Sequence, residues 1–173
     1  MIKFHKISLE QWDKDFAVEI CDKNGNPKEY KWVYPSNPYD EIKLPKRATK
    51  FSAGYDIYSP VDFKLEPGDV IKLPLGIRVE MNDNVFLMIV PRSGLGFKYG
   101  FQLTNTCGII DKDYFYSDNE GHIHGKFINT LHKTLEIKKG EAICQGIFMN
   151  YLITDDDNAD GIRNGGFGST SKG

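Results

Sequence analysis

The sequence lacks the features that mark several common protein classes. Helical periodicity is almost absent, no apolar run is long enough to span a bilayer, and the start, MIKFHKISLEQWDKDF, lacks the apolar core of a signal peptide. The net charge is −2, so no basic excess indicates a nucleic-acid partner. We therefore expect a protein with neither nucleic-acid nor membrane partners.

Cysteine pairing is also missing. The three cysteines, Cys21, Cys107 and Cys144, are widely spaced. No Cys-x-x-Cys pair indicates a zinc site, and an odd number argues against a disulfide framework. The pattern predicts a reduced, cytoplasmic protein.

Short strand signals dominate what is present. Segments such as DVIKLPLGIRVEM, VFLMIVP and EAICQGIFMNYLI are rich in β-branched and aromatic residues and are separated by Gly, Pro, Asn or Asp. FAVEIC and KEYKWVY flank an Asn24-Gly25 step that is typical of a hairpin turn. Only SLEQWDKDF, with Ser8 as its cap, and a turn or two after Ser93 favour a helix. Residues 1–154 therefore predict a single all-β domain, a sandwich, jelly roll or small barrel. Residues 155–173 are polar and Gly-rich, which predicts a flexible C-terminal arm.

The segment Pro-Arg-Ser-Gly at residues 91–94 is the first candidate for chemistry. It follows an apolar strand and precedes the possible helix start. A helix N-terminus leaves free N–H groups, and Arg92 adds a forked donor, so this turn is suited to phosphate. The structural alternative, a surface turn with a solvated arginine, is favoured when the segment is considered alone.

Carboxylates provide two further candidates. Asp111 and Asp113 lie two residues apart, which places them on one face of an expected strand. Such a pair can hold a cation or orient a water, and one member can act as general base; alternatively, the pair ends a polar strand. Asp56 follows a small-residue turn, AGY, where a structural role in bonding local amides is as well supported as a functional one.

The fourth candidate is the tail segment RNGGFGST, residues 163–170. Packing in a core gives little reason for this combination of one aromatic residue with glycines, an arginine and two hydroxyl side chains. Glycines let the backbone approach a ligand, an aromatic ring can stack on a base, and Arg, Ser and Thr can donate to phosphates. We expect an arm that becomes ordered over a nucleotide. In contrast, His122 and His124 lack metal-ligand spacing and alternate along an expected strand, which predicts a structural role.

Taken in order, five segments resemble the five motifs of the trimeric dUTPase family, and the resemblance runs from about Leu44 to the C-terminus. The five segments are AGYDIYS at 53–59, PRSGLG at 91–96, NTCGIIDKDY at 105–114, KKGEAICQG at 138–146 and RNGGFGST at 163–170. Each motif alone is weak, but five in this order are hard to produce by accident.

The resemblance implies a fold and an activity. The fold is a distorted jelly-roll or β-barrel subunit with very little helix, whose C-terminal arm is exchanged within a homotrimer. The activity is hydrolysis of dUTP to dUMP and pyrophosphate, with Mg²⁺ held mainly by the substrate phosphates and waters and by no direct protein ligand. Asp111 corresponds to the acid that activates the water attacking the α-phosphate, and Asp56 to a support for the metal-water and interface network.

The resemblance also implies a set of substrate-binding residues. They are Arg92, Ser93, Gly94, Asn105, Gly108, Ile110, Tyr114, Gln145, Arg163, Phe167, Gly168, Ser169 and Thr170. Tyr114 would lie under the deoxyribose and exclude a 2′-hydroxyl, and the hairpin around Asn105 would read the polar edge of uracil. Gln145 would join the phosphate-binding turn at Arg92 and Ser93.

In the arm, Phe167 would stack on uracil, while Arg163, Ser169 and Thr170 would hold the γ-phosphate. The arm departs from the family pattern, with one residue fewer between Arg163 and the following Gly pair, and this changes the reach of the arginine.

Three other departures from the family pattern accompany this shortened spacing. An insertion at residues 115–121 replaces the usual Arg-Gly after the third motif and removes a charge that normally braces the site, and Ala142 stands where the family usually has Arg. A further insertion at about residues 8–40 has no assigned purpose. Added loops of this kind suggest a viral or prophage origin, and then a host cytoplasm.

Two alternatives remain open at this stage. A dCTP deaminase shares the fold but needs a Glu on the strand after the third motif, where this chain has Lys126. The other is a nucleotide-binding regulatory protein in which the N-terminal insertion docks a protein partner and the arm acts as a switch.

Overall fold

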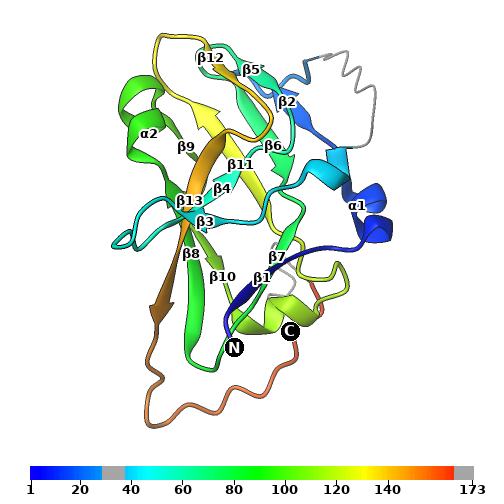
Figure 1. Ribbon diagram of the computed structural model, residues 1–173, viewed down its shortest axis with the longest axis vertical. Coiled ribbons are helices and arrows are strands. Elements are labelled where there is room, and N and C mark those ends of the chain that lie inside the picture. Colours follow the sequence, from blue (N-terminus) through cyan, green and yellow to red (C-terminus); the bar gives the residue numbers. More distant parts are fainter. Residues whose placement is uncertain (29–37, 166–173) are drawn as a thin grey trace.

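The computed structural model describes residues 1–28 and 38–165. Short strands make up most of the ordered elements, with two helices and two 3-10 turns among them (Figure 1). The elements are, in chain order, β1 Lys3–Lys6, α1 Leu9–Asp15, β2 Glu19–Cys21, η1 Pro38–Glu41, β3 Lys46–Arg47, β4 Tyr55–Tyr58, β5 Phe63–Leu65, β6 Val70–Pro74, β7 Ile77–Glu80, β8 Val85–Pro91, α2 Ser93–Tyr99, β9 Phe101–Leu103, β10 Gly108–Ile110, η2 Lys112–Tyr116, β11 His124–Asn129, β12 Leu135–Ile137 and β13 Ala142–Asn150. No helix within the described ranges has the length and apolar character to cross a membrane.

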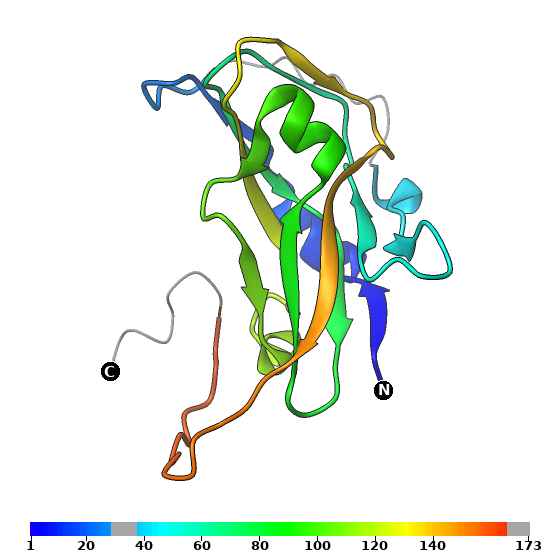
Figure 2. The same ribbon diagram turned by 90° about the vertical axis from the view of Figure 1, so that its left-hand side faces the viewer.

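Two larger antiparallel sheets form the body of the domain. Their strand orders are β10-β8-β13-β4-β3 and β2-β6-β11-β9. The pair β12-β5 lies at one end of the long axis and the pair β1-β7 towards the other (Figure 1). Figure 2 shows β8 and β13 running side by side, with α2 beyond one end of β8. The prediction of an all-β, jelly-roll-like subunit with very little helix is confirmed.

Alternating side chains explain how the sheets enclose a core. Along β8, Val85, Leu87 and Ile89 are buried, while the residues between them are only half-buried. This period of two fixes which face of the strand points inward. In the other sheet Phe127 stacks on Phe101, with ring centroids 5.0 Å apart.

The N-terminal segment is part of this core. The hydroxyl of Ser8 accepts the N–H of Gln11 at 3.1 Å, so the cap predicted from the sequence is confirmed. This helix places Trp12 in the core with none of its surface exposed. β2 then pairs with β6, and the turn after it has Gly25 in the left-handed region at φ +84°. Of the second strand expected for this hairpin, KEYKWVY, only Lys28 is described, and its backbone N–H donates to the carbonyl of Ile20 at 2.8 Å. The rest of this segment lies outside the described residues.

The expected strand that would place Asp111 and Asp113 on one face is wrong. β10 ends at Ile110, and Asp111 precedes the 3-10 helix η2. The carbonyl of Asp111 accepts the N–H of Tyr114 at 3.2 Å, so a local turn bond replaces the strand ladder.

The turn that follows η2 closes tightly against it. Gly121 has φ +71°, and a Cβ at this position would lie 2.6 Å from the carbonyl oxygen of Tyr114. Only glycine allows both the backbone conformation and this close approach.

Two histidines follow this turn. Only His124 lies in β11, so the expectation that both alternate along one strand is wrong for His122, although their rings lie 4.2 Å apart between centroids. His122 is completely buried, and burial lowers its pKa to about 4. Burial also lowers the pKa of His124.

Lowering the pH from 6.5 to 4 is expected to destabilise the protein. The unfolded chain takes up a proton at the ordinary histidine pKa of 6.5, whereas folded His122 stays neutral down to about 4. Protons therefore favour the unfolded state in this window, and His122 alone costs on the order of 3 kcal/mol of stability across it. Urea unfolding at several pH values measures the effect.

The matched variants are His122→Gln, which removes the buried imidazole, and His132→Gln, the same substitution at an exposed position. The first should flatten the pH dependence in part, because His124 still titrates, and the second should leave it unchanged. Equal pH dependence in the wild-type protein and in His122→Gln would contradict the assignment.

Candidate functional site

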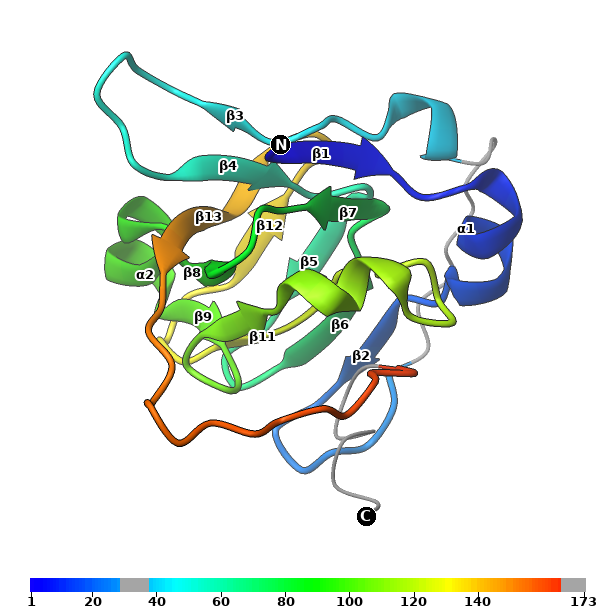
Figure 3. The ribbon, with the colours of Figure 1, turned by 90° about the horizontal axis from the view of Figure 1, so that it is seen from below.

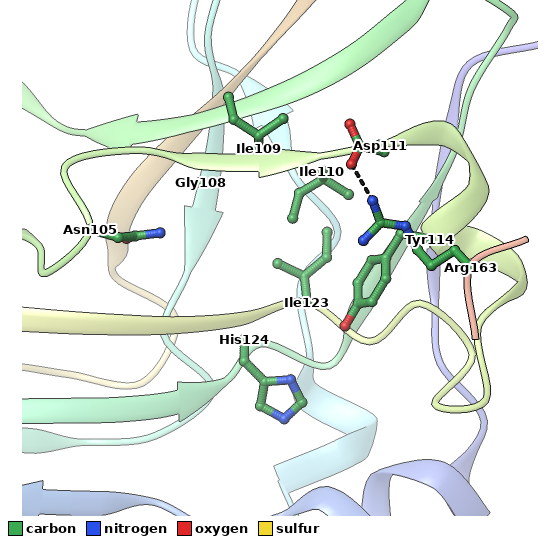
Figure 4. Close-up of a pocket in the computed structure, with 9 residues that line it drawn as sticks. All are labelled: Asn105, Gly108, Ile109, Ile110, Asp111, Tyr114, Ile123, His124 and Arg163. Atoms are coloured by element: carbon green, nitrogen blue, oxygen red, sulfur yellow. Dashed lines mark hydrogen bonds and ion pairs between the residues drawn. The ribbon is translucent and has the colours of Figure 1, made fainter. Parts of the chain in front are cut away.

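A pocket opens between the turn and strand that follow β9, η2, the start of β11 and the C-terminal segment (Figure 4). Its lining residues come from four separate parts of the chain and are Asn105, Gly108, Ile109, Ile110, Asp111, Tyr114, Ile123, His124 and Arg163. Six of these were predicted as site residues from the sequence, namely Asn105, Gly108, Ile110, Asp111, Tyr114 and Arg163. The structure thus brings together the third motif and the start of the fifth.

Arg163 binds both carboxylates at the mouth of this pocket. Its Nη2 lies 2.5 Å from Oδ2 of Asp111, and its Nε donates to Oδ1 of Asp113 at 2.9 Å. The two Asp side chains are about half exposed, at 47% and 55%. The C-terminal segment that carries this arginine runs below the sheets (Figure 1) and crosses the view from below (Figure 3), and its contact with η2 is the ion pair with Asp113. The expected contact of Arg163 with a γ-phosphate remains a prediction.

Tyr114 forms one wall of the pocket. Its hydroxyl donates to the carbonyl of His122 at 2.7 Å and accepts from Nδ2 of Asn119 at 2.9 Å. The residue is buried, and burial raises the pKa of its hydroxyl. Figure 4 shows the ring between Ile123 and Arg163, with its hydroxyl pointing away from Asp111. The ring is therefore held at both ends, by η2 and by the turn that precedes β11.

The turn between β9 and β10 provides the opposite wall. The hairpin expected around Asn105 is wrong, because β9 pairs with β11 and β10 with β8, so this turn connects the two sheets. It has Thr106 in the left-handed region at φ +71°. The hollow continues past Asn105 and Gly108 towards Lys126 on β11. Exposed backbone groups in such a turn can read the polar edge of a planar ligand.

Ile123 and His124 line the pocket but were not predicted as site residues. They follow the 115–121 insertion, and no motif marks them. For His124 the only signal is its alternation with His122, which predicts a structural role; no signal marks Ile123.

A second group of predicted residues surrounds the start of α2. Arg92 donates from Nη1 to the carbonyl of Ala142 at 3.0 Å, and its Nε lies 3.0 Å from Oδ1 of Asp56. Nε2 of Gln145 donates to the carbonyl of Pro91 at 3.1 Å. This arrangement follows from the register, because Gln145 on β13 pairs with Asp56 on one side and with Val90 on the other.

The helix predicted after Ser93 is confirmed as α2, and Arg92 is its N-terminal cap position without a side-chain cap bond. A shallow groove beside it is lined by Pro91, Arg92, Ser93, Gly96, Phe97, Gly100, Phe101 and Gln102. A Cβ added at Gly94 would meet nothing within 4 Å, so the backbone there is open to a ligand.

Within one chain these two groups lie far apart. Ile110, which precedes Asp111, pairs with Leu87 on β8. Arg92 follows the end of the same strand, five residues beyond Leu87. At the rise of an extended strand this separation is roughly 17 Å. The structure therefore does not bring Arg92, Ser93 and Gln145 to the pocket of Asp111.

Four predicted residues of the arm, Phe167, Gly168, Ser169 and Thr170, lie outside the described residues. Candidate metal ligands in the described ranges fall in two places. Asp111 and Asp113 offer oxygen ligands at the pocket, and Asp15, His122 and His124 bring three potential ligand atoms within 4.8 Å of one another behind it.

Comparison with known proteins gives a consistent result. The dUTPase family model matches residues 40–171. The deoxyuridine 5′-triphosphate nucleotidohydrolase of Lactococcus lactis subsp. lactis is 41% identical over 132 residues, which cover 75% of this chain and 88% of that protein. The crystal structure of the dUTPase from Streptococcus mutans superposes with a TM-score of 0.61 at 36% identity, covering 67% of this chain and 91% of that one.

A more distant structure matches nearly the whole chain. It is a mutant dUTPase from phage phi11 of S. aureus, which reveals the coordination of a structural Mg(II) ion. Its TM-score is 0.60 at 14% identity, and the match covers 95% of this chain and 99% of that one, so the likeness shows a shared fold. Together with the family model and the Lactococcus relative, these findings show that the chain belongs to the dUTPase family.

Proposed function

We propose that the protein hydrolyses dUTP to dUMP and pyrophosphate. The observation that carries this proposal is the pocket in which Asp111, Tyr114 and the turn around Asn105 face one space. A carboxylate, an aromatic wall and exposed backbone polar groups match a water, a sugar and a base, respectively. The turn around Asn105 would exclude the methyl group of thymine by its close fit and cytosine by the polarity of its hydrogen bonds.

Asp111 acts as the general base in this proposal. It accepts a proton from a water whose oxygen forms a bond to the α-phosphorus, while the bond from that phosphorus to the bridging oxygen breaks and pyrophosphate leaves. Tyr114 lies against the deoxyribose, where its ring leaves no room for a 2′-hydroxyl. Phosphate contacts fall to the first turn of α2, where the backbone N–H groups of Ser93 and Gly94 are donors, and to the side chains of Arg92 and Gln145.

Mg²⁺ is the proposed cofactor. Two half-exposed carboxylates, Asp111 and Asp113, offer too few oxygens for a closed cage, which suits an ion that keeps most of its waters and binds substrate phosphates. The His-rich group behind the pocket offers nitrogen atoms, which this hard cation does not prefer. When bound, Mg²⁺ would neutralise charge on the phosphate oxygens.

The homotrimer that the resemblance implies is part of this proposal, and the separation of the two groups on β8 supports an assembly of several copies. The phosphate-binding turn of one chain cannot reach the pocket of the same chain, so another copy must supply it. Exposed apolar side chains favour such contacts, among them Leu152 at 97%, Phe97 at 88% and Ile162 at 89% exposure. The arm, with Phe167, Gly168, Ser169 and Thr170, would close a pocket of the assembled trimer.

Turnover of several nucleotides tests the activity. The protein is incubated with Mg²⁺ and each of dUTP, dCTP, dTTP and UTP, and monophosphate, pyrophosphate and deaminated product are measured. We expect rapid release of dUMP and pyrophosphate from dUTP alone. Absence of turnover with every nucleotide would reject the enzymatic proposal, and deamination of dCTP would show that Lys126, on the edge of the base hollow, does not exclude that chemistry.

Asp111→Asn should retain dUTP binding and lose nearly all turnover, by at least roughly a hundred-fold, since the amide cannot accept the proton. Steady-state kinetics and calorimetric binding separate the two effects. Asp118→Asn, an exposed carboxylate in the loop after η2, is the matched control and should behave as the wild-type protein. If Asp111→Asn retains turnover and Asp113→Asn loses it, Asp113 and not Asp111 is the general base.

Removing residues 165–173 should reduce kcat/KM for dUTP and leave the homotrimer intact, because the shortened chain keeps every sheet. Sedimentation equilibrium measures the oligomeric state, and kinetics measure the loss. Dissociation of the truncated protein into monomers would contradict a role for the arm in closing the site.

A regulatory role remains the second candidate. The N-terminal insertion at about residues 8–40 would dock a protein partner, although its buried residue Trp12 already serves the core of the domain. A partner that is released by dUTP would favour this reading.

A further inference from the structure

The N-terminal segment and the 115–121 insertion contact each other, although they are more than a hundred residues apart in sequence. The backbone N–H of Ser8 donates to Oε2 of Glu120 at 2.8 Å, and its hydroxyl donates to Oε1 at 2.6 Å. At the other end of α1, Asp15 lies 2.7 Å from Nδ1 of His122. Figure 3 shows α1 beside the turn that follows η2. Both ends of the helix are thus attached to the same turn.

The hydrogen bonds of His122 define its protonation. The backbone N–H of Gly76 donates to Nε2 at 2.9 Å, so this nitrogen carries a lone pair. The single proton of the neutral ring therefore lies on Nδ1 and is donated to Oδ2 of Asp15. The low pKa that burial gives this ring agrees with a neutral form. His122 is a completely buried bridge between the β6–β7 turn and α1.

A metal ion does not fit this bridge. Asp15, His122 and His124 have ligand atoms within 4.8 Å of one another. A metal bound to Nδ1 of His122 would move the ring proton to Nε2, where it would face the N–H of Gly76. Two donors facing each other in a buried site are costly. The group therefore acts through hydrogen bonds.

The same residue holds the pocket wall. The carbonyl of His122 accepts the hydroxyl of Tyr114, and Asn119 donates to that hydroxyl from within the insertion. The backbone of His122 thus anchors the ring of Tyr114. The side chain of His122 fixes that backbone, and its partner Asp15 comes from the N-terminal segment. Residues 1–39 precede the part of the chain that the family model matches.

We propose that Asp15, acting through His122, positions Tyr114 and so sets the preference of the pocket for deoxyribose over ribose. This inference rests on the proposed function, in which Tyr114 lies against the sugar. Asp15 and His122 are positioning residues, since neither touches the substrate. Without Asp15 the buried Nδ1–H of His122 loses its acceptor, the turn shifts to satisfy it, and the ring no longer excludes a 2′-hydroxyl.

The geometry of Asp15 provides a conservative variant. Its Oδ2 accepts from both His122 and Nε2 of Gln11, the latter at 2.8 Å. Asp15→Asn can keep one carbonyl oxygen in this place, and therefore both hydrogen bonds, whereas Asp15→Ala removes them. Asp13→Ala on the same helix changes the charge equally at an exposed position and is the matched control.

The experiment compares kcat and KM for dUTP and UTP in the full-length protein and these three variants. In Asp15→Ala we expect kcat for dUTP within about two-fold of the wild type, and a roughly ten-fold fall in the ratio of kcat/KM for dUTP to that for UTP, the size of one charge-assisted hydrogen bond. Asp15→Asn should restore most of the ratio, and Asp13→Ala should not change it. A purely structural role would lower the active fraction for both substrates equally, so an unchanged ratio in Asp15→Ala would overturn the inference.

Calorimetric binding of dUMP and UMP separates this inference from the proposed function. If the wild-type protein turns over no nucleotide, the proposed function fails, and the ratio of the two Kd values replaces the kinetic ratio. A preference for dUMP that Asp15→Ala loses would then support the positioning role. Equal binding of dUMP and UMP by the wild-type protein would overturn it.

Discussion

The pairing of β8 with β10 on one side and β13 on the other is the constraint on which the site depends. Because a paired strand has fixed length and register, Asp111 at one end and Arg92 at the other cannot approach each other through small movements. Strand pairing also fixes the turn at Arg92. Gln145 on β13 pairs with Asp56 on β4 and with Val90 on β8, two residues before Arg92. Assembly of several copies is thus a geometric requirement for a site that uses both groups.

Local sequence signals predicted local structure well. The cap at Ser8 and the helix after Ser93 depend on interactions within one turn, so the residues that form them are adjacent in sequence. Asp111 and Asp113 were placed on a strand because their spacing of two fits its period. The bond from the N–H of Tyr114 to the carbonyl of Asp111 ends the strand instead, and no pattern in the sequence signals it.

The contacts that could not be predicted from the sequence are those between strands that are far apart along the chain. The ordered motifs of the family predicted which residues belong to a site, but the residues alone gave no reason for Gln145 to meet Pro91 and Asp56. That meeting follows from strand register, which is set by the packing of whole sheets. The contact between Asp15 and His122 spans 107 residues and joins the N-terminal segment to the residue that directly follows the 115–121 segment.

The N-terminal segment stabilises the turn at the end of the 115–121 segment. The turn after η2 places Glu120 at φ +58° and Gly121 at φ +71°, and the first of these is unfavourable for a residue with a side chain. Ser8 satisfies both oxygens of the Glu120 carboxylate, and Arg78 donates to its carbonyl at 3.4 Å. Without the N-terminal segment the side chain of Glu120 would lose both hydrogen bonds from Ser8, and only the bond from Arg78 and the bonds within the turn would remain.

The ion pairs of Arg163 with Asp111 and Asp113 connect the arm to the same pocket, and their strength determines what they can do. Both carboxylates are about half exposed, so each pair contributes on the order of 1 kcal/mol or less. Phosphate oxygens of a bound nucleotide offer the guanidinium stronger, bidentate contacts. In the proposed reaction, transfer of Arg163 to a phosphate would leave Oδ2 of Asp111 open to a hydrogen bond from the attacking water. A pair this weak can keep the start of the arm near the pocket without preventing that transfer.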